Sequence, residues 1–171
     1  MVIFLHIMGI FLLVKFLSRS FSGLPSPGVV IIKYWFFSRV WHEELEEFFR
    51  GYEEDHGAKL DIIIMNSVLW DTNRWGPFYV KNYKENFEKL IATLKETLSD
   101  NGHFIWLTNQ PGSKYLNSKA MEIPGLQFQK ITTRYNVIEA NFFAAHKVAE
   151  AGYSVIDLHY YFLLQTFRRN R

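Results

Sequence analysis

The alternation of apolar runs with amphipathic segments is the feature that most constrains the fold of this chain. Residues 60–66, "LDIIIMN", form a continuous apolar run, as in a strand covered on both faces. Residues 82–102 place apolar side chains three and four positions apart, which predicts a helix ended by Asn101-Gly102. Strands that alternate with long helices predict βαβ units. The expected class is therefore α/β, a three-layer α/β/α sandwich with a mostly parallel sheet.

Other segments extend the same pattern in both directions. "VVIIKYWFF", residues 29–37, is β-branched and aromatic and predicts a strand, and "HEELEEFFRGY", residues 42–52, predicts a helix with a solvated acidic face. Residues 103–109 and 153–158 predict two further strands. Residues 135–151 predict a helix that stops at Gly152, with these residues turned inward: Ile138, Phe142, Ala145 and Val148 or Ala149.

Length and composition bound the function. The 171 residues suit a single domain, and the net charge of +2 without a sustained basic stripe argues against nucleic-acid binding. The absence of cysteine excludes disulfides, zinc-thiolate sites and a cysteine nucleophile. The scattered histidines show no metal-ligand spacing, so we expect neither a metal nor a cofactor.

The first residues differ in character from the rest. Residues 1–22 are mainly apolar and predict either a signal- or anchor-like segment or a helix packed on the domain. Residues 23–28 are a Pro/Gly linker, and residues 29–171 form the domain. Membrane contact is expected only through residues 2–17. The location is cytoplasmic or, if residues 1–22 act as a signal, secretory or membrane-associated.

Polar residues follow three of the predicted strands. They are Asn66-Ser67, Thr108-Asn109 and the segment from Asp157 to His159. Parallel α/β sheets bind ligands beyond the carboxyl ends of their strands. We therefore expect these three tips to lie on one rim, where such a fold keeps its chemistry.

An ordered set of motifs in this chain resembles a known family. The elements are "NSVLWD", "YKENFEKL", "FIWLTNQP", "EANFFAA" and "VIDLHYYF", in that order. The set is similar to the PC-esterase family, in particular the animal PC-esterase domain-containing proteins, which belong with the SGNH or GDSL-like hydrolases. The resemblance covers roughly residues 29–171.

The resemblance implies an acyl-ester hydrolase or acyltransferase fold. Such enzymes use a serine in an early Gly-Asp-Ser motif, an asparagine that donates to the oxyanion, and a late Asp-x-x-His motif. Asn66 matches the asparagine. The chain has no Gly-Asp-Ser, and it stops at Arg171, about where the late motif would begin. We therefore expect a partial domain, truncated at both ends, that retains the fold without the esterase chemistry.

The remaining candidate residues have modest expected roles. Ser67 is a possible substitute nucleophile, although no motif places a base beside it. Trp70 is expected to be a core or pocket-wall aromatic, and Asp71 to cap the next turn or to hold a loop through Arg74. Asp157 and His159 lie two apart on a predicted strand and therefore share a face, as a structural pair or a dyad. The other candidate ligand contact is Asn109.

Two alternatives to an inactive hydrolase fold stay open. One is an active hydrolase that uses Ser67 or a linker serine with His159. The other is a non-catalytic binding domain, secreted or membrane-tethered, whose aromatic rim takes a carbohydrate or acyl ligand. The expected rim residues are Trp70, Trp75, Tyr79 and Tyr160.

Overall fold

The computed structural model describes residues 10–17, 29–57, 59–72, 78–111 and 129–168. The linker 23–28, Arg74 and Trp75 lie outside the described residues. The element order is β1 (Ile10–Leu17), β2 (Val29–Phe36), α1 (Glu43–His56), β3 (Leu60–Asn66), α2 (Tyr79–Thr97), β4 (Leu98–Leu107), α3 (Gln129–Glu150), β5 (Ser154–Ile156) and α4 (Leu158–Arg168).

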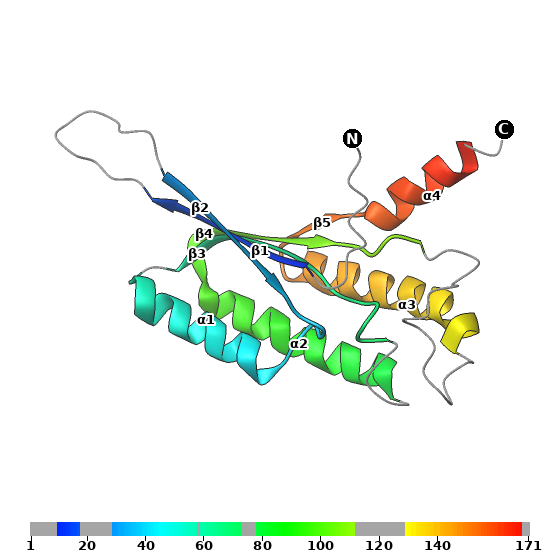
Figure 1. The fold of residues 1–171 in the computed structure, drawn as a ribbon, viewed down its shortest axis with the longest axis horizontal. Helices are drawn as coiled ribbons and strands as arrows, with labels where there is room; N and C mark the ends of the chain where they lie inside the picture. Colours follow the sequence, from blue (N-terminus) through cyan, green and yellow to red (C-terminus); the bar gives the residue numbers. More distant parts are fainter. Residues whose placement is uncertain (1–9, 18–28, 58, 73–77, 112–128, 169–171) are drawn as a thin grey trace.

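The strands form one sheet in the order β2-β1-β3-β4-β5. Strands β3, β4 and β5 run parallel, with Met65 beside Trp106 and Trp106 beside Val155. The predicted α/β class is confirmed, and the arrangement is consistent with an incomplete SGNH-like α/β/α fold. Figure 1 shows α1, α2 and α3 on the same side of the sheet, while α4 points away from the end of β5.

The start of the chain differs from the expected packed helix. Residues 10–17 form β1, which pairs antiparallel with β2 on one side and with β3 on the other. An apolar run of this length fits a buried helix or a central strand equally well, so its periodicity does not choose between them. Pairing with a strand on each side satisfies the backbone groups of β1, and this long-range pairing selects the strand. The signal-like interpretation of residues 1–22 stays a prediction.

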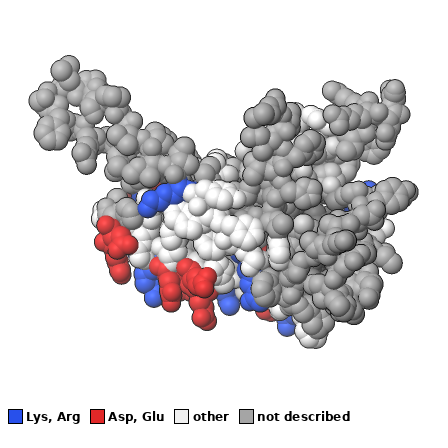
Figure 2. Space-filling model, viewed as in Figure 1, with Lys and Arg blue, Asp and Glu red and all other residues white. Residues whose placement is uncertain are grey.

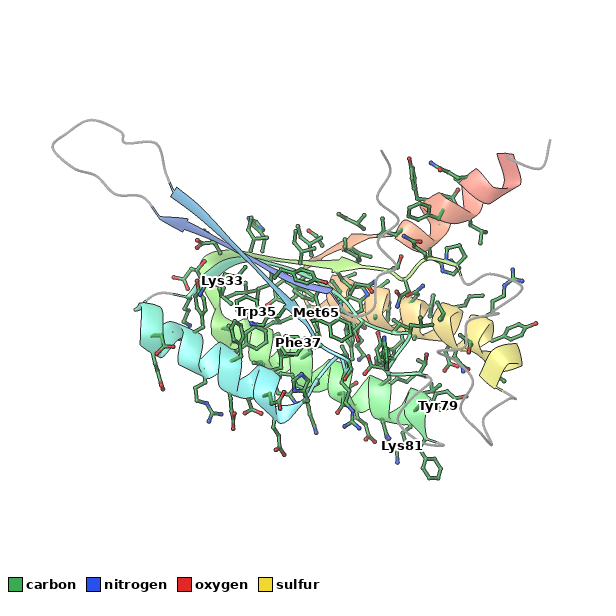
Figure 3. All side chains as sticks on the ribbon, in the orientation of Figure 1. Lys33, Trp35, Phe37, Met65, Tyr79 and Lys81 are labelled. Atoms are coloured by element: carbon green, nitrogen blue, oxygen red, sulfur yellow. The ribbon has the colours of Figure 1, made fainter. Side chains whose placement is uncertain are left out.

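The hydrophobic core lies between the sheet and the helices. Figure 3 shows Lys33, Trp35 and Met65 on the helix side of the sheet, and the Trp35 ring lies 4.6 Å from that of Phe48 in α1. Phe87 of α2 meets Trp106 of β4 edge to face, with ring centroids 4.9 Å apart. Such pairs add to the free energy gained from burying the rings themselves.

Two helices confirm their predicted patterns. The spacing in residues 82–102 predicts an apolar stripe of Tyr83, Phe87, Leu90, Ile91, Leu94 and Leu98, and the first three of these and Leu94 are the buried residues of α2. The carboxylates of α1 lie on the surface (Figure 2), where Glu46 pairs with Arg50 at 2.9 Å. The solvated acidic face of α1 is therefore confirmed.

The predicted inward face of α3 was wrong at Ile138 and Phe142 and confirmed only at Val148. Ile138 and Phe142 are 45% and 76% exposed, whereas Val137, Ala140, Ala144 and Val148 are buried. The buried face carries small side chains, which allow close approach to the neighbouring elements, and it also carries the polar residues Thr133, Asn136 and Asn141. Hydrophobic periodicity cannot identify a face of this composition. Gly152 does end the helix, with a φ of 81° that favours glycine.

The predicted stop at Asn101-Gly102 was also wrong, because α2 ends at Thr97 and β4 begins at Leu98. A Cβ at position 102 would lie 2.9 Å from the carbonyl oxygen of Ser99, which explains the glycine. The β3–β4 register shifts next to this point, between Leu60 and Ile62. Glycine therefore marks a bend at the start of a strand rather than a helix terminus.

Candidate functional site at the carboxyl ends of the parallel strands

The structure joins the tips of β4 and β5 through Thr108. Its hydroxyl donates to Asp157 Oδ1 at 2.8 Å and accepts from the backbone N–H of His159 at 2.9 Å. The backbone N–H of Thr108 donates to the carbonyl of Ile156. The polar residues after these two strands therefore meet at one rim, as parallel pairing requires.

Asn66 links the tip of β3 to the same rim. Its side chain is buried, and Nδ2 donates to the carbonyl of Leu107 in β4 at 2.6 Å. A carbonyl can only accept, so this contact fixes the orientation of the amide. Nδ2 carries a second hydrogen, and Oδ1 has no hydrogen-bond partner among the described residues. The hydrogen bond that Nδ2 donates to Leu107 thus holds the amide in place.

Asn141 of α3 clamps the backbone of Asn109. Asn141 Oδ1 accepts from the Asn109 N–H at 2.9 Å, and Asn141 Nδ2 donates to the Asn109 carbonyl at 2.8 Å. Both residues are buried. The side-chain Nδ2 of Asn109 is also buried and has no hydrogen-bond partner in the part of the chain that the structure describes. Asn141 was not among the residues predicted from the sequence. The only feature that could have indicated it is that an asparagine lies within a mainly apolar helical segment.

His159 completes this cluster from α4. Its Nδ1 lies 2.9 Å from the Asn109 carbonyl and 3.2 Å from Asn141 Nδ2. Because the carbonyl only accepts, we assign the imidazole proton to Nδ1, which leaves the lone pair on Nε2. This is the tautomer in which Nε2 can accept a proton.

Asp157 and His159 do not share a strand, since β5 ends at Ile156 and α4 begins at Leu158. Asp157 Oδ1 accepts from the backbone N–H of Tyr160 at 3.0 Å, as well as from Thr108. Asp157 therefore caps the first turn of α4. The strand prediction failed here because the short apolar run carries no signal for where a strand gives way to a helix.

A second buried cluster lies around Asp71. The hydroxyl of Ser67 donates to Asp71 Oδ2, and the backbone N–H of Val40 lies 2.9 Å and 3.1 Å from the two carboxyl oxygens. Tyr83 donates its hydroxyl to the Ser67 carbonyl at 3.3 Å. Asp71 thus ties the segment before α1 to the segment after β3.

Burial raises the pKa of the Asp71 carboxyl to about 6. Hydrogen bonds from Ser67 and Val40 and the positive charge of Arg39 oppose the rise without cancelling it. A cleft of about 210 Å³, lined in part by Asp71, Arg39 and Tyr83, borders the carboxyl. The Asp71 carboxyl is therefore expected to change its protonation state in the mildly acidic range.

Comparison with curated proteins identifies the family of this chain. PC-esterase domain-containing protein 1B from Homo sapiens is 32% identical over 133 residues, which are 77% of this chain and 30% of that protein. PC-esterase domain-containing protein 1A from Mus musculus is 29% identical over 144 residues, 84% of this chain and 31% of that protein. The chain belongs to the PC-esterase family. It spans about a third of the length of the curated relatives it matches.

No family model and no solved structure matches the chain. Membership in the PC-esterase family therefore rests on these sequence relatives, with the α/β fold in agreement. Among the described residues, no helix is both long and apolar enough to cross a membrane.

Two aromatic residues of the expected rim lie apart from the Asn109 cluster. Trp70 is half-buried and meets Phe36 of β2 edge to face, with ring centroids 6.5 Å apart. The Tyr79 hydroxyl accepts from Asn136 Nδ2 at 3.0 Å, which ties α2 to α3. Tyr160 is 61% exposed on α4. These contacts place the Trp70 ring against Phe36 of β2 and the Tyr79 hydroxyl between α2 and α3.

We predict that the Asp71→Asn variant loses part of the pH dependence of stability. A carboxyl with a raised native pKa stabilises the fold below its unfolded pKa of about 4, and that stability is lost as pH rises through about 6. The two-unit difference corresponds to about 3 kcal/mol. Asparagine keeps an acceptor for the Val40 N–H but does not titrate.

The measurement is urea unfolding across this pH range. The Asp55→Asn variant is the control, because it removes an exposed carboxylate. Its free energy of unfolding should depend on pH as that of the wild type does. If the free energy of unfolding of Asp71→Asn fell with rising pH as much as that of the wild type, the raised pKa of Asp71 would be contradicted.

Proposed function

We propose that this chain forms the oxyanion-binding side of an acyl-ester hydrolase or acyltransferase site, with the Asn66 side chain as a hydrogen-bond donor to the oxyanion. The support is the Asn66 amide, which is buried and held by Leu107 with a second Nδ2 hydrogen remaining. A donor fixed before the reaction stabilises the developing oxyanion without a cost of reorganisation.

We further propose that the chain by itself does not hydrolyse esters through Ser67. The observation that carries this proposal is the hydrogen bond from the Ser67 hydroxyl to Asp71, in a cluster where the described contacts include no histidine. A serine needs a base that removes its proton and then returns it to the leaving group. A buried carboxylate that also accepts from the Val40 N–H is poorly placed for that exchange.

The test treats the chain with a serine-directed fluorophosphonate probe and with p-nitrophenyl acetate. We expect no labelling of Ser67 and the same turnover for the wild type and the Ser67→Ala variant. Stoichiometric labelling mapped to Ser67 by mass spectrometry, with turnover lost in both Ser67→Ala and His159→Gln, would replace this proposal by the active-hydrolase alternative.

A second candidate function is a non-catalytic binding domain for a carbohydrate or acyl ligand. It is supported by two buried amide atoms without hydrogen-bond partners, Asn66 Oδ1 and Asn109 Nδ2, since such atoms gain a partner when a polar ligand binds. Butyrate and methyl glucoside serve as acyl and carbohydrate probes. If this function holds, one of them should shift the side-chain amide resonances of Asn66 and Asn109, whereas unshifted resonances with both would remove the candidate.

A further inference from the structure

Helix α4 has an unusual composition for a helix outside the core. Seven of its eleven positions are large and apolar. The other four are His159, Gln165, Thr166 and the final Arg168. A helix that is apolar nearly all round is normally buried. The apolar residues are Leu158, Tyr160, Tyr161, Phe162, Leu163, Leu164 and Phe167.

The position of α4 leaves much of this surface uncovered. The helix points away from the sheet and the other helices (Figure 1), and its first turn is held by the contacts of Asp157 and Thr108. Tyr160 is 61% exposed, Tyr161 56% and Leu164 45%. Leu164 follows Tyr160 by four positions and Tyr161 by three, and residues at these spacings lie on one face of a helix, so these three side chains form a single outward face.

Positive charge follows this outward face in the sequence. Arg168 lies in the last turn of α4, and Arg169 and Arg171 follow in the sequence, while no acidic residue occurs after Asp157. Exposed tyrosine and leucine followed in the sequence by arginine match a segment that lies at a membrane interface, where aromatic rings sit at headgroup depth and basic residues favour anionic lipid. An eleven-residue helix is about 16 Å long, roughly half a bilayer core, so it can lie on a membrane but not span it.

We propose that α4 is a membrane-surface helix that contacts an anionic lipid surface through Tyr160, Tyr161 and Leu164. This contact is separate from the membrane contact expected of residues 2–17. It is also independent of the esterase-type site, because no side chain of these three residues contacts Asn66 or Asn109 among the described contacts.

The test is flotation of the full chain with vesicles of phosphatidylcholine, with and without phosphatidylserine. We expect about tenfold more bound protein with phosphatidylserine, and a loss of that difference at high salt. The triple variant Tyr160→Ser, Tyr161→Ser, Leu164→Gln should lower binding to the anionic vesicles about tenfold. Its thermal unfolding should match the wild type, because the replaced side chains are exposed.

The matched control is Phe78→Ser, which removes an aromatic ring that is 69% exposed at the start of α2. Tyr79, the neighbouring residue, lies on the helix side of the sheet, away from α4 (Figure 3). This variant should bind vesicles as the wild type does. Loss of binding in Phe78→Ser comparable to that in the triple variant would contradict a face confined to α4.

Three results would overturn the proposal. The first is equal binding to both kinds of vesicle. The second is full binding by the triple variant, which would assign membrane contact to another part of the chain, such as residues 2–17. The third is a dimer in light scattering that the triple variant converts to a monomer, with no vesicle binding by the wild type, which would assign the face to a second copy of the chain.

Discussion

The Phe87→Ala variant should lose about 4 kcal/mol of the free energy of unfolding. Phe87 is fully buried, and its ring meets those of Tyr83, Trp106 and Phe143 with centroids 5.7, 4.9 and 6.1 Å away. Removing the ring loses its burial and leaves a cavity at the point where α2, β4 and α3 meet. Surrounding aromatic rings are stiff, so the cavity cannot close by small shifts.

Urea unfolding followed by tryptophan fluorescence measures this loss. Phe142→Ala is the matched control, since Phe142 is 76% exposed on α3, and its change should stay below about 0.5 kcal/mol. Phe87→Leu, which fills most of the space, should cost about 1.5 kcal/mol and gives a measurable variant if the alanine variant does not fold. A larger loss for Phe142→Ala than for Phe87→Ala would reverse our assignment of the buried face of α3.

The Asn141→Leu variant should lose about 3 kcal/mol, although leucine is close in size and more apolar. The substitution removes both hydrogen bonds to the Asn109 backbone and leaves a buried N–H without an acceptor. The Asn109 carbonyl still accepts a hydrogen bond from His159 in the variant. Most of the lost free energy of unfolding therefore comes from the Asn109 backbone N–H, which has lost its acceptor. A general preference of helices for leucine would predict stabilisation instead.

Two measurements separate these expectations. Urea unfolding gives the free energy, and hydrogen exchange should show faster exchange at the Asn109 amide in the variant than in the wild type. The exposed Asn82→Leu variant of α2 makes the same replacement away from the cluster and should change stability by less than about 0.5 kcal/mol. Unchanged exchange at Asn109 in Asn141→Leu would show that the clamp is dispensable.

Elements with strong periodicity were predictable from the sequence. The stripe of α2 contains Phe87 and Leu90 at three-residue spacing, and an amphipathic helix of this length has few competing conformations. The run that forms β3 was equally clear, and Asn66 was placed correctly at its end. Parallel pairing then brings the tips of β3, β4 and β5 to one edge, so the location of the candidate rim also followed from the pattern.

The partners within that rim were not predictable. Asp71 bonds to Val40, thirty-one positions earlier, and Asn109 bonds to Asn141, thirty-two positions later. Local sequence carries no information about pairs so far apart. The buried face of α3 was hidden for a related reason, because it presents alanine and asparagine while phenylalanine and isoleucine face outward.

The sequence by itself determined the α/β class, the order of the main strands and helices, and the strand end that carries Asn66. Each of these depends on side-chain periodicity along a continuous segment. Only the tertiary structure decided that residues 10–17 pair between β2 and β3, that Asn141 and His159 hold Asn109, and that Ser67 donates to Asp71. These contacts join segments distant in the chain, and the free energy that selects them comes from pairing buried polar groups once the fold has brought them together.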